Sequence, residues 1–270
     1  TGEVGLVAFA PGGTALWIGD AGVAQLWQIK DGALLRQIDT GDGIADDLSP
    51  DGAYLLSALA DGRVQVWDAQ SGQPLRTLNG HHGEVSARFV ANGRAILTAS
   101  WDKTAILWDT ASGEKLRTFA GHTETVFDAD LSPDGVQVLT ASLDMTARIW
   151  DAATGAERYR IAVHTAPVHN AIFAPDGRSL LTGSTDGTVR LWDLAKLREP
   201  HTFAAQTGLI FGLALSPDGK QLLTGSADMT AVLWDVASGR QVRTFQLANW
   251  ADNVAFSPDG KLALIAPGYG

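Results

Sequence analysis

The stretch SLLTGSTDGTVRLWDL at residues 179–194 decides the fold, because close copies of it recur along the chain. It combines hydroxyl side chains, an aspartate and a tryptophan with alternating apolar residues, and His164 lies a little upstream. Hydroxyl, imidazole and carboxylate groups are also the parts of a hydrolase triad. The sequence therefore raises the question of whether these polar groups perform chemistry or hold the chain together.

A tryptophan recurs at an almost constant spacing. The tryptophans at this phase are Trp27, Trp67, Trp108, Trp150, Trp192 and Trp234, separated by 40, 41, 42, 42 and 42 residues, and Asp follows five of them. The turn sequence SPDG recurs in step at 49–52, 132–135, 216–219 and 257–260. Short runs of alternating apolar residues between turns indicate strands. Each unit is therefore expected to form four short antiparallel strands.

A single four-stranded sheet cannot bury both of its faces, whereas sheets stacked radially bury them against one another. The repeat length and the Trp-Asp ending resemble the WD-repeat family of β-propellers, in the regular form of bacterial multidomain proteins. The resemblance covers nearly the whole chain. It implies an all-β, seven-bladed β-propeller of four-stranded antiparallel blades, with strands a to d running outward from a central channel. The last blade is incomplete within this chain.

The blades are expected near 1–40, 41–80, 81–121, 122–163, 164–205 and 206–246, with a partial blade at 247–270. The expected innermost strands are Val4–Phe9, Ile44–Leu48, Val85–Val90, Val126–Leu131, Val168–Phe173, Leu209–Leu215 and Ala251–Phe256. The seventh unit continues only to a strand at Lys261–Ile265. The missing strands are expected in chain outside this segment of a larger protein, or the ring is left frayed. A six-bladed ring with a dangling tail is the alternative.

The resemblance also implies a hydrogen-bonded tetrad of Trp, Ser or Thr, His and Asp in each regular blade. A buried indole N–H needs an acceptor, or it costs about 1–3 kcal/mol. The matching residues are His81, Thr98, Asp102 and Trp108; His122, Thr140, Asp144 and Trp150; and His164, Thr182, Asp186 and Trp192. His82 is a weaker rival to His81. The sixth unit keeps Thr224, Asp228 and Trp234 with Gln206 in place of His; the second keeps Ser57, Asp61 and Trp67 with Asp39 there; the first keeps Trp27, with Trp17 at the hydroxyl position.

Catalysis at this cluster is disfavoured, because a triad is one exceptional set of residues, whereas these recur at the same phase in several units. We expect no enzyme activity, no cofactor and no metal: the chain has no cysteine, no zinc-type spacing and no phosphate-binding loop. The net charge of −10 argues against wide contact with nucleic acid. We expect no membrane span, because no apolar run is long enough, and no signal peptide at the start of this sequence. The compartment stays open, with the cytoplasm favoured.

Three charged residues share one phase in neighbouring innermost strands: Asp47, Arg88 and Asp130. Because innermost strands of adjacent blades run side by side, Arg88 is expected between the two carboxylates. Such a cluster is interpreted as an ion cluster between blades, and a ligand site in the channel is the alternative.

The partner surface is expected on the face that carries the d–a and b–c loops, as in WD-repeat propellers. Apolar residues beside the tetrad positions predict it: Trp101, Phe127, Leu143, Met145, His169, Phe211 and Met229. The leading hypothesis is a non-catalytic scaffold or sensor domain that binds a protein, a peptide or another domain of the same polypeptide. The alternatives are a regulatory domain with a small ligand in the channel and a propeller enzyme.

Overall fold

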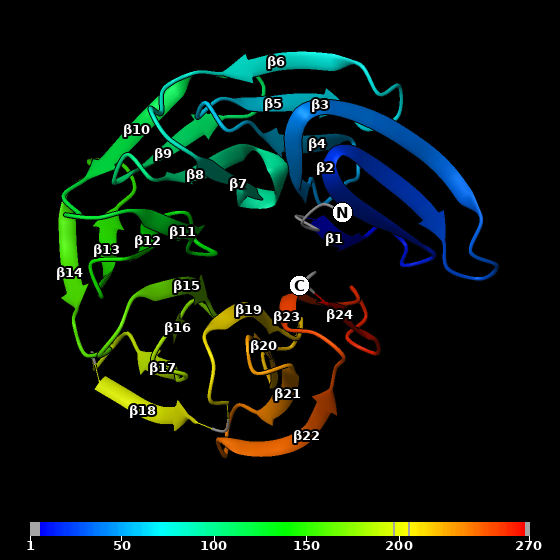
Figure 1. Ribbon diagram of the computed structural model, residues 1–270. Helices are drawn as coiled ribbons and strands as arrows, with labels where there is room; N and C mark the ends of the chain where they lie inside the picture. Colours follow the sequence, from blue (N-terminus) through cyan, green and yellow to red (C-terminus); the bar gives the residue numbers. More distant parts are fainter. Residues whose placement is uncertain (1–5, 197, 205, 268–270) are drawn as a thin grey trace.

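The computed structural model describes residues 6–196, 198–204 and 206–267, and these form 24 strands and one short 3-10 helix. The all-β prediction is thus confirmed. Figure 1 shows the sheets following one another around a common centre, with the earliest strand of each regular sheet innermost. No helix in the described part of the chain is long and apolar enough to cross a membrane.

Four sheets are regular, and each contains four consecutive antiparallel strands. Two of them are formed by β7 (Val85–Val90), β8 (Ala95–Ser100), β9 (Thr104–Asp109) and β10 (Lys115–Ala120), and by β11 (Val126–Leu131), β12 (Gln137–Ser142), β13 (Ala147–Asp151) and β14 (Glu157–Ile161). The others are formed by β15 (Val168–Phe173), β16 (Ser179–Ser184), β17 (Val189–Asp193) and β18 (Arg198–Phe203), and by β19 (Ile210–Leu215), β20 (Gln221–Ser226), β21 (Thr230–Asp235) and β22 (Arg240–Gln246). The helix η1 (Ala91–Gly93) joins β7 to β8. Strands β7, β11 and β15 have the bounds expected for innermost strands.

The first sheet departs from the expected pattern, because six strands are hydrogen-bonded into one sheet. They are β1 (Leu6–Phe9), β2 (Ala15–Gln28), β3 (Leu34–Leu48), β4 (Tyr54–Ala58), β5 (Val64–Asp68) and β6 (Pro74–Leu78). Four short strands were expected in the first unit, but residues 15–28 form one strand, β2, with an irregularity between Ala21 and Val23. The first unit has Ala21 at the position of the turn aspartate of the later units.

The chain ends in a two-stranded sheet of β23 (Ala251–Phe256) and β24 (Ala263–Pro267). The first of these has the expected bounds, while the second begins two residues later than expected. Strand β23 lies beside both β19 and β1, so the two ends of the described chain meet. Residues 4 and 5 of the expected first strand lie outside the described residues.

The hydrophobic core lies between neighbouring sheets. One cluster joins Leu139 and Ile149 of one sheet to Val168, Leu180 and Trp192 of the next, and the other clusters repeat this pattern. Both faces of an inner sheet are therefore buried, which explains why strands such as β8 are buried along their whole length. The tryptophan near the end of the third strand of each regular sheet lies in this core, so its polar indole N–H group is placed there as well.

A test of the merged first sheet is available at Gly19. A Cβ at this position would lie 2.5 Å from Ala45 Cβ and 2.9 Å from Leu6 Cβ. Gly19→Ala should lower the free energy of unfolding by about 1–3 kcal/mol through overpacking, as measured by urea denaturation. Thr14→Ala in the exposed turn nearby is the control, with an expected change within about 0.5 kcal/mol. Equal stability of Gly19→Ala and the parent protein would contradict the close approach of β1, β2 and β3.

Candidate functional site: buried polar chains, an axial cavity and an exposed turn edge

Residues His81, Thr98, Asp102 and Trp108 meet between β8, β9 and the loop before β7. The Trp108 Nε1–H donates to Thr98 Oγ1 at 2.9 Å, which lies 2.8 Å from His81 Nε2. His81 Nδ1 lies 2.8 Å from Asp102 Oδ2, and the same oxygen accepts the His82 backbone N–H. His81 is thus the histidine that takes part in this series of hydrogen bonds, whereas the side chain of His82 is exposed.

The next two sheets repeat this chain of bonds. The distances from indole to hydroxyl, from hydroxyl to imidazole and from imidazole to carboxylate are 2.9, 2.7 and 2.8 Å for Trp150, Thr140, His122 and Asp144. They are 3.0, 2.8 and 2.9 Å for Trp192, Thr182, His164 and Asp186. Repetition with this constancy indicates one structural device used three times.

The direction of the protons follows from the bond count. The threonine hydroxyl already accepts the indole proton. The Thr98 oxygen lies 2.8 Å from His81 Nε2 and 3.2 Å from the Ile106 carbonyl oxygen, so the nearer, unprotonated Nε2 is the better acceptor of the single hydroxyl proton. The other ring nitrogen then carries the proton that is donated to the aspartate. A neutral histidine fits this arrangement. Accordingly, burial lowers the pKa of His81 and of His122, and the neighbouring carboxylate offsets this only in part.

The sheet of β19–β22 makes the same connection with glutamine. The Thr224 hydroxyl accepts the Trp234 indole proton at 3.0 Å and donates to Gln206 Oε1 at 2.6 Å. The amide Nε2 of Gln206 then donates to Thr230, whose hydroxyl donates to Asp228. An amide, which also accepts at one end and donates at the other, thus replaces the imidazole.

In the second unit, the first hydrogen bond of the series, from the indole to the hydroxyl, is present, and the described His-position and turn aspartates do not continue it. The Trp67 indole donates to Ser57 Oγ at 2.9 Å, but Asp61 pairs with Arg63 at the surface and Asp39 accepts the Gly41 backbone N–H. In the first unit Trp17 is buried, and Trp27 is half-buried. The chains of bonds are therefore complete in the middle of the molecule and shortened toward its start.

Sequence reasoning missed a threonine two residues after each tetrad aspartate. The hydroxyls of Thr104, Thr146 and Thr188 donate to their aspartates at 2.5–2.6 Å. Burial alone would raise the pKa of Asp144, but the bonds from Thr146 and His122 lower it to about 2. The repeated pattern Asp-x-Thr was the available signal.

The tetrads offer no place for a substrate. The hydroxyl-bearing residues Thr98 and Thr182 have no exposed surface, and Thr140 has 1 %. Each hydroxyl is already bonded to an indole and an imidazole, so an attacking group would have to break the core. Nor do the described residues contain a group of three His, Cys, Asp or Glu side chains that could hold a metal ion.

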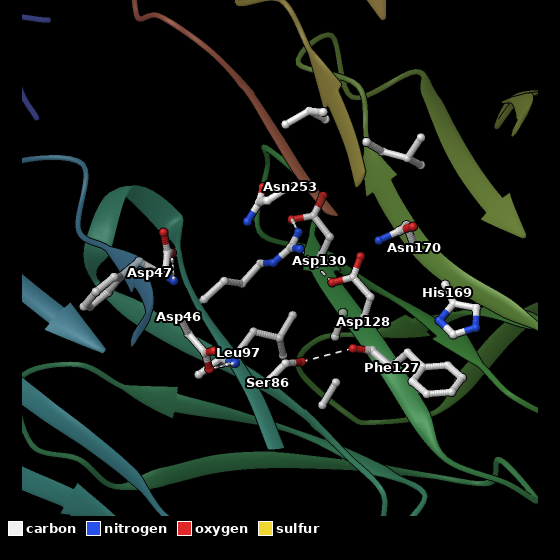
Figure 2. A pocket seen from close by; sticks show the side chains of 17 residues that line it. Asp46, Asp47, Ser86, Leu97, Phe127, Asp128, Asp130, His169, Asn170 and Asn253 are labelled. Atoms are coloured by element: carbon white, nitrogen blue, oxygen red, sulfur yellow. Dashed lines mark hydrogen bonds and ion pairs between the residues drawn. The ribbon is translucent and has the colours of Figure 1, made fainter. Parts of the chain in front are cut away.

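Charged side chains of the innermost strands surround a cavity of about 500 Å³ at the centre of the molecule, here called the axial cavity. It is lined by Asp46, Asp47, Ser86, Ala87, Arg88, Phe89, Leu97, Ala99, Phe127, Asp128, Ala129, Asp130, His169, Asn170, Leu213, Asn253 and Val254. Figure 2 shows Asp46 and Asp47 of β3 on one side and Asp128 and Asp130 of β11 on the other. The Arg88 guanidinium lies 2.7 Å from Asp128 and 3.8 Å from Asp130. Its shortest ion pair thus goes to a residue outside the expected set of three.

The carboxylates also connect neighbouring sheets. Asp47 Oδ2 accepts the Phe89 backbone N–H and Asp130 Oδ2 accepts that of Phe173, each at 2.7 Å. Asp46 and Asp128 accept the N–H groups of Ala87 and Ala171 in the same way. These N–H groups lie on the innermost strand of the following sheet. The cluster thus joins β3 to β7 and β11 to β15.

Burial gives this cluster unusual acidities. Desolvation raises the pKa of Asp47 to about 6 despite the hydrogen bond from Phe89 and the charge of Arg88. The pKa values of Asp46, Asp128 and Asp130 are raised by burial as well. Burial opposes the charge of Arg88, but the carboxylates of Asp128 and Asp130 raise its pKa above the ordinary value. Burial thus favours the neutral form of these carboxyl groups, whereas the charge of Arg88 favours their ionised form.

The b–c turns expose large apolar side chains. Trp101 is 56 % exposed, Met145 47 %, Met229 46 % and Leu143 38 %. Lys103, Met145 and Met229 occupy one equivalent turn position at φ of 74°, 66° and 66°, where two other units have Gly62 and Gly187 at 90° and 77°. A side chain at positive φ costs on the order of 1 kcal/mol or more. These turns retain long side chains where stability alone favours glycine.

The other expected contact residues lie nearer the axis. Phe127 stacks on His169 with ring centres 4.2 Å apart, and both line the axial cavity. Phe211 is half-buried, and its carbonyl accepts a hydrogen bond from Asn170. A groove of about 180 Å³, here called the Trp101 groove, is lined by Glu84, Val85, Ser86, Ala99, Trp101, Val126 and Phe127. Trp101 and Phe127 therefore meet in one groove, whereas no contact joins Met229 to it.

Comparison with known families matches residues 44–266 to the family described as the IFT122 first beta-propeller. The chain belongs to this family. The match spans most of the described residues and confirms the prediction of a β-propeller of the WD-repeat type. Propellers of this type generally serve as non-catalytic scaffolds for protein interactions. No curated protein matches the chain.

Removal of one tetrad hydroxyl tests the buried chain. Thr140→Val leaves the Trp150 indole N–H and His122 Nε2 without their partner, so the free energy of unfolding should fall by about 2–4 kcal/mol. Chemical denaturation followed by tryptophan fluorescence measures the change. The exposed Thr123→Val is the control and should stay within about 0.5 kcal/mol of the parent protein. A loss as small as that of the control would show that the hydroxyl does not hold the indole.

The raised pKa of Asp47 predicts a pH dependence with a definite sign. The folded protein keeps this proton up to about pH 6, whereas the unfolded chain loses it near pH 4. The favourable contribution of Asp47 is therefore full below about pH 4 and lost as the pH rises through 6. Asp47→Asn stays neutral and keeps an acceptor for Phe89. Its stability relative to the parent should be higher at about pH 7.5 than at about pH 5, by on the order of 1–2 kcal/mol.

Urea denaturation at the two pH values measures this difference. Asp218→Asn is the control, because Asp218 is exposed and its pKa is lowered by hydrogen bonds from Ser216 and Lys220. This control should gain nothing at the higher pH. A pH-independent effect of Asp47→Asn would show that Asp47 is ionised in the folded protein throughout this range.

Proposed function

We propose that this chain is a non-catalytic scaffold that holds a protein or peptide partner on the edge formed by its b–c turns. The observation that carries the proposal is the exposed Trp101, at the rim of a groove and on the same turn edge as Leu143 and Met145. Exposed tryptophan in an apolar setting is typical of binding hot spots. The partner is a separate protein or another domain of the same polypeptide, in which this chain acts as a scaffold or a sensor domain.

The proposal includes a seven-bladed ring with the boundaries expected from the repeat. In this arrangement β1, the two halves of β2 and the first half of β3 form a distorted first blade. The second half of β3 begins the next blade, and β23 and β24 begin the seventh. The contact between β23 and β1 supports it. The regularity of the repeats supports the likeness to bacterial multidomain proteins.

A second candidate function is a regulatory domain with a small ligand in the channel. The axial cavity, with about 500 Å³ of space and a polar lining, favours it. Such a ligand would bind independently of the turn edge. The two functions therefore differ in whether Trp101 matters.

The leading function is tested by selection of peptides on the immobilised protein from a random displayed library. The selected peptides are then titrated by calorimetry against the parent protein and Trp101→Ala. Loss of a hot-spot tryptophan costs about 2 kcal/mol or more, so the Kd should rise about 30-fold. Val242→Ala, on outer strand β22 and equally exposed at 56 %, is the matched control and should bind like the parent. Equal affinity of the parent and Trp101→Ala for every selected peptide would refute the turn edge as the binding surface.

A further inference from the structure

We propose that the axial cavity receives the cationic side chain of a lysine or arginine in the bound partner, while an apolar neighbour of that residue fills the Trp101 groove. This inference rests on the proposed function and names the chemistry of the partner. It combines the charge of the cavity with the shape and apolar lining of the groove.

The charge balance of the axial cavity favours a cation. In the described chain its walls carry four carboxylates, whereas Arg88 supplies the one permanent positive charge. The ion pairs of Arg88 go to Asp128 and Asp130 on β11. On the facing wall Asp46 and Asp47 bond to backbone N–H groups and form no ion pair among the described residues. Burial raises the pKa of both carboxyl groups, so a cation placed beside them would favour their ionised form. Net charge of −10 over the chain adds long-range attraction for a basic segment.

The cavity and the groove adjoin one another. Ser86, Ala99 and Phe127 line both, so a short segment that bends between two adjacent residues can place their side chains in the two spaces. A fully extended segment would point these side chains in opposite directions. Both orders of the two residues are tested, because the bend can present either one to the cavity. The stacked rings of Phe127 and His169 at the cavity wall present an aromatic surface that attracts a cation.

A peptide fits these observations better than a free cation. A small polyamine could satisfy the carboxylates, but it would leave the groove between Trp101 and Phe127 empty. Covering the exposed apolar surface of Trp101 contributes favourably to the binding of a partner. A partner with cationic and apolar groups side by side satisfies both features at once.

The test uses labelled peptides of the form acetyl-Gly-Ser-X-Z-Ser-Gly-amide and fluorescence anisotropy. Leu-Arg and Arg-Leu at X-Z are compared with Leu-Lys, Leu-Gln, Leu-Glu and Gly-Arg. A cationic peptide with leucine should bind at least about ten-fold more tightly than Leu-Gln and Gly-Arg, because a charge-assisted bond and an apolar contact are each lost. Raising NaCl from about 50 mM to about 300 mM should weaken the cationic peptides selectively.

Variants then locate the cation and the leucine. Asp46→Asn retains an acceptor for Ala87 and should weaken Leu-Arg about five-fold or more while leaving Leu-Gln unchanged. The exposed Asp218→Asn is the matched control, with no effect expected. Trp101→Ala should weaken Leu-Arg but leave Gly-Arg unchanged.

The outcomes separate this inference from the proposed function. Neutral or acidic peptides that bind best and still require Trp101 would overturn the inference and leave the scaffold function standing. If spermidine binds in a manner that depends on Asp46, and the protein shows no preference for leucine-containing peptides, the ligand of the axial cavity is a free cation and not a peptide. Loss of Trp101 dependence for the library-selected peptides would instead refute the scaffold function itself.

Discussion

A buried indole N–H must have an acceptor, and the blades of this molecule are organised around that requirement. Each repeated tryptophan from Trp67 to Trp234 contributes a large apolar ring to the core between sheets, but its single polar group would cost about 1–3 kcal/mol if left unpaired. A serine or threonine on the neighbouring strand accepts this proton in the five units from Trp67 to Trp234. Gln206 shows which property matters at the next step, because it shares with neutral histidine the ability to accept a proton from the hydroxyl and donate one onward.

The same requirement operates at the axis on backbone groups. Among the described residues, the innermost strands of neighbouring sheets are not paired by backbone hydrogen bonds, and any buried N–H group on them needs another acceptor. Asp47 and Asp130 supply these acceptors across the boundary between sheets. This solution concentrates carboxylates in a confined space with a single guanidinium among the described lining residues. A structural necessity thereby creates a cavity whose charge suits a cation.

The regular part of this fold is predictable from the sequence because the strands, turns and tetrads recur with one phase. Asp46 was missed for a physical reason: adjacent residues of a regular strand point to opposite faces, and only the irregularity between Ala45 and Asp47 lets both carboxylates reach β7. Asp128 was missed because the shared phase points to Asp130, whereas the Arg88 side chain reaches the residue two positions earlier on β11. The continuous course of β2 depends on packing of Gly19 against Ala45, which no local pattern in the sequence specifies.

Stability and binding place different demands on the turn that follows each tetrad aspartate. The aspartate fixes this turn from inside by accepting the N–H of the residue two positions on, as Asp186 does with Thr188. The residue between them then adopts a positive φ, for which glycine is the least costly choice. Gly187 meets that demand, whereas Met145 does not and holds a flexible apolar side chain in solvent. Because the tetrad beneath supplies the stability that such a turn gives up, the polar residues that resemble an active site instead support the turns of the proposed binding edge.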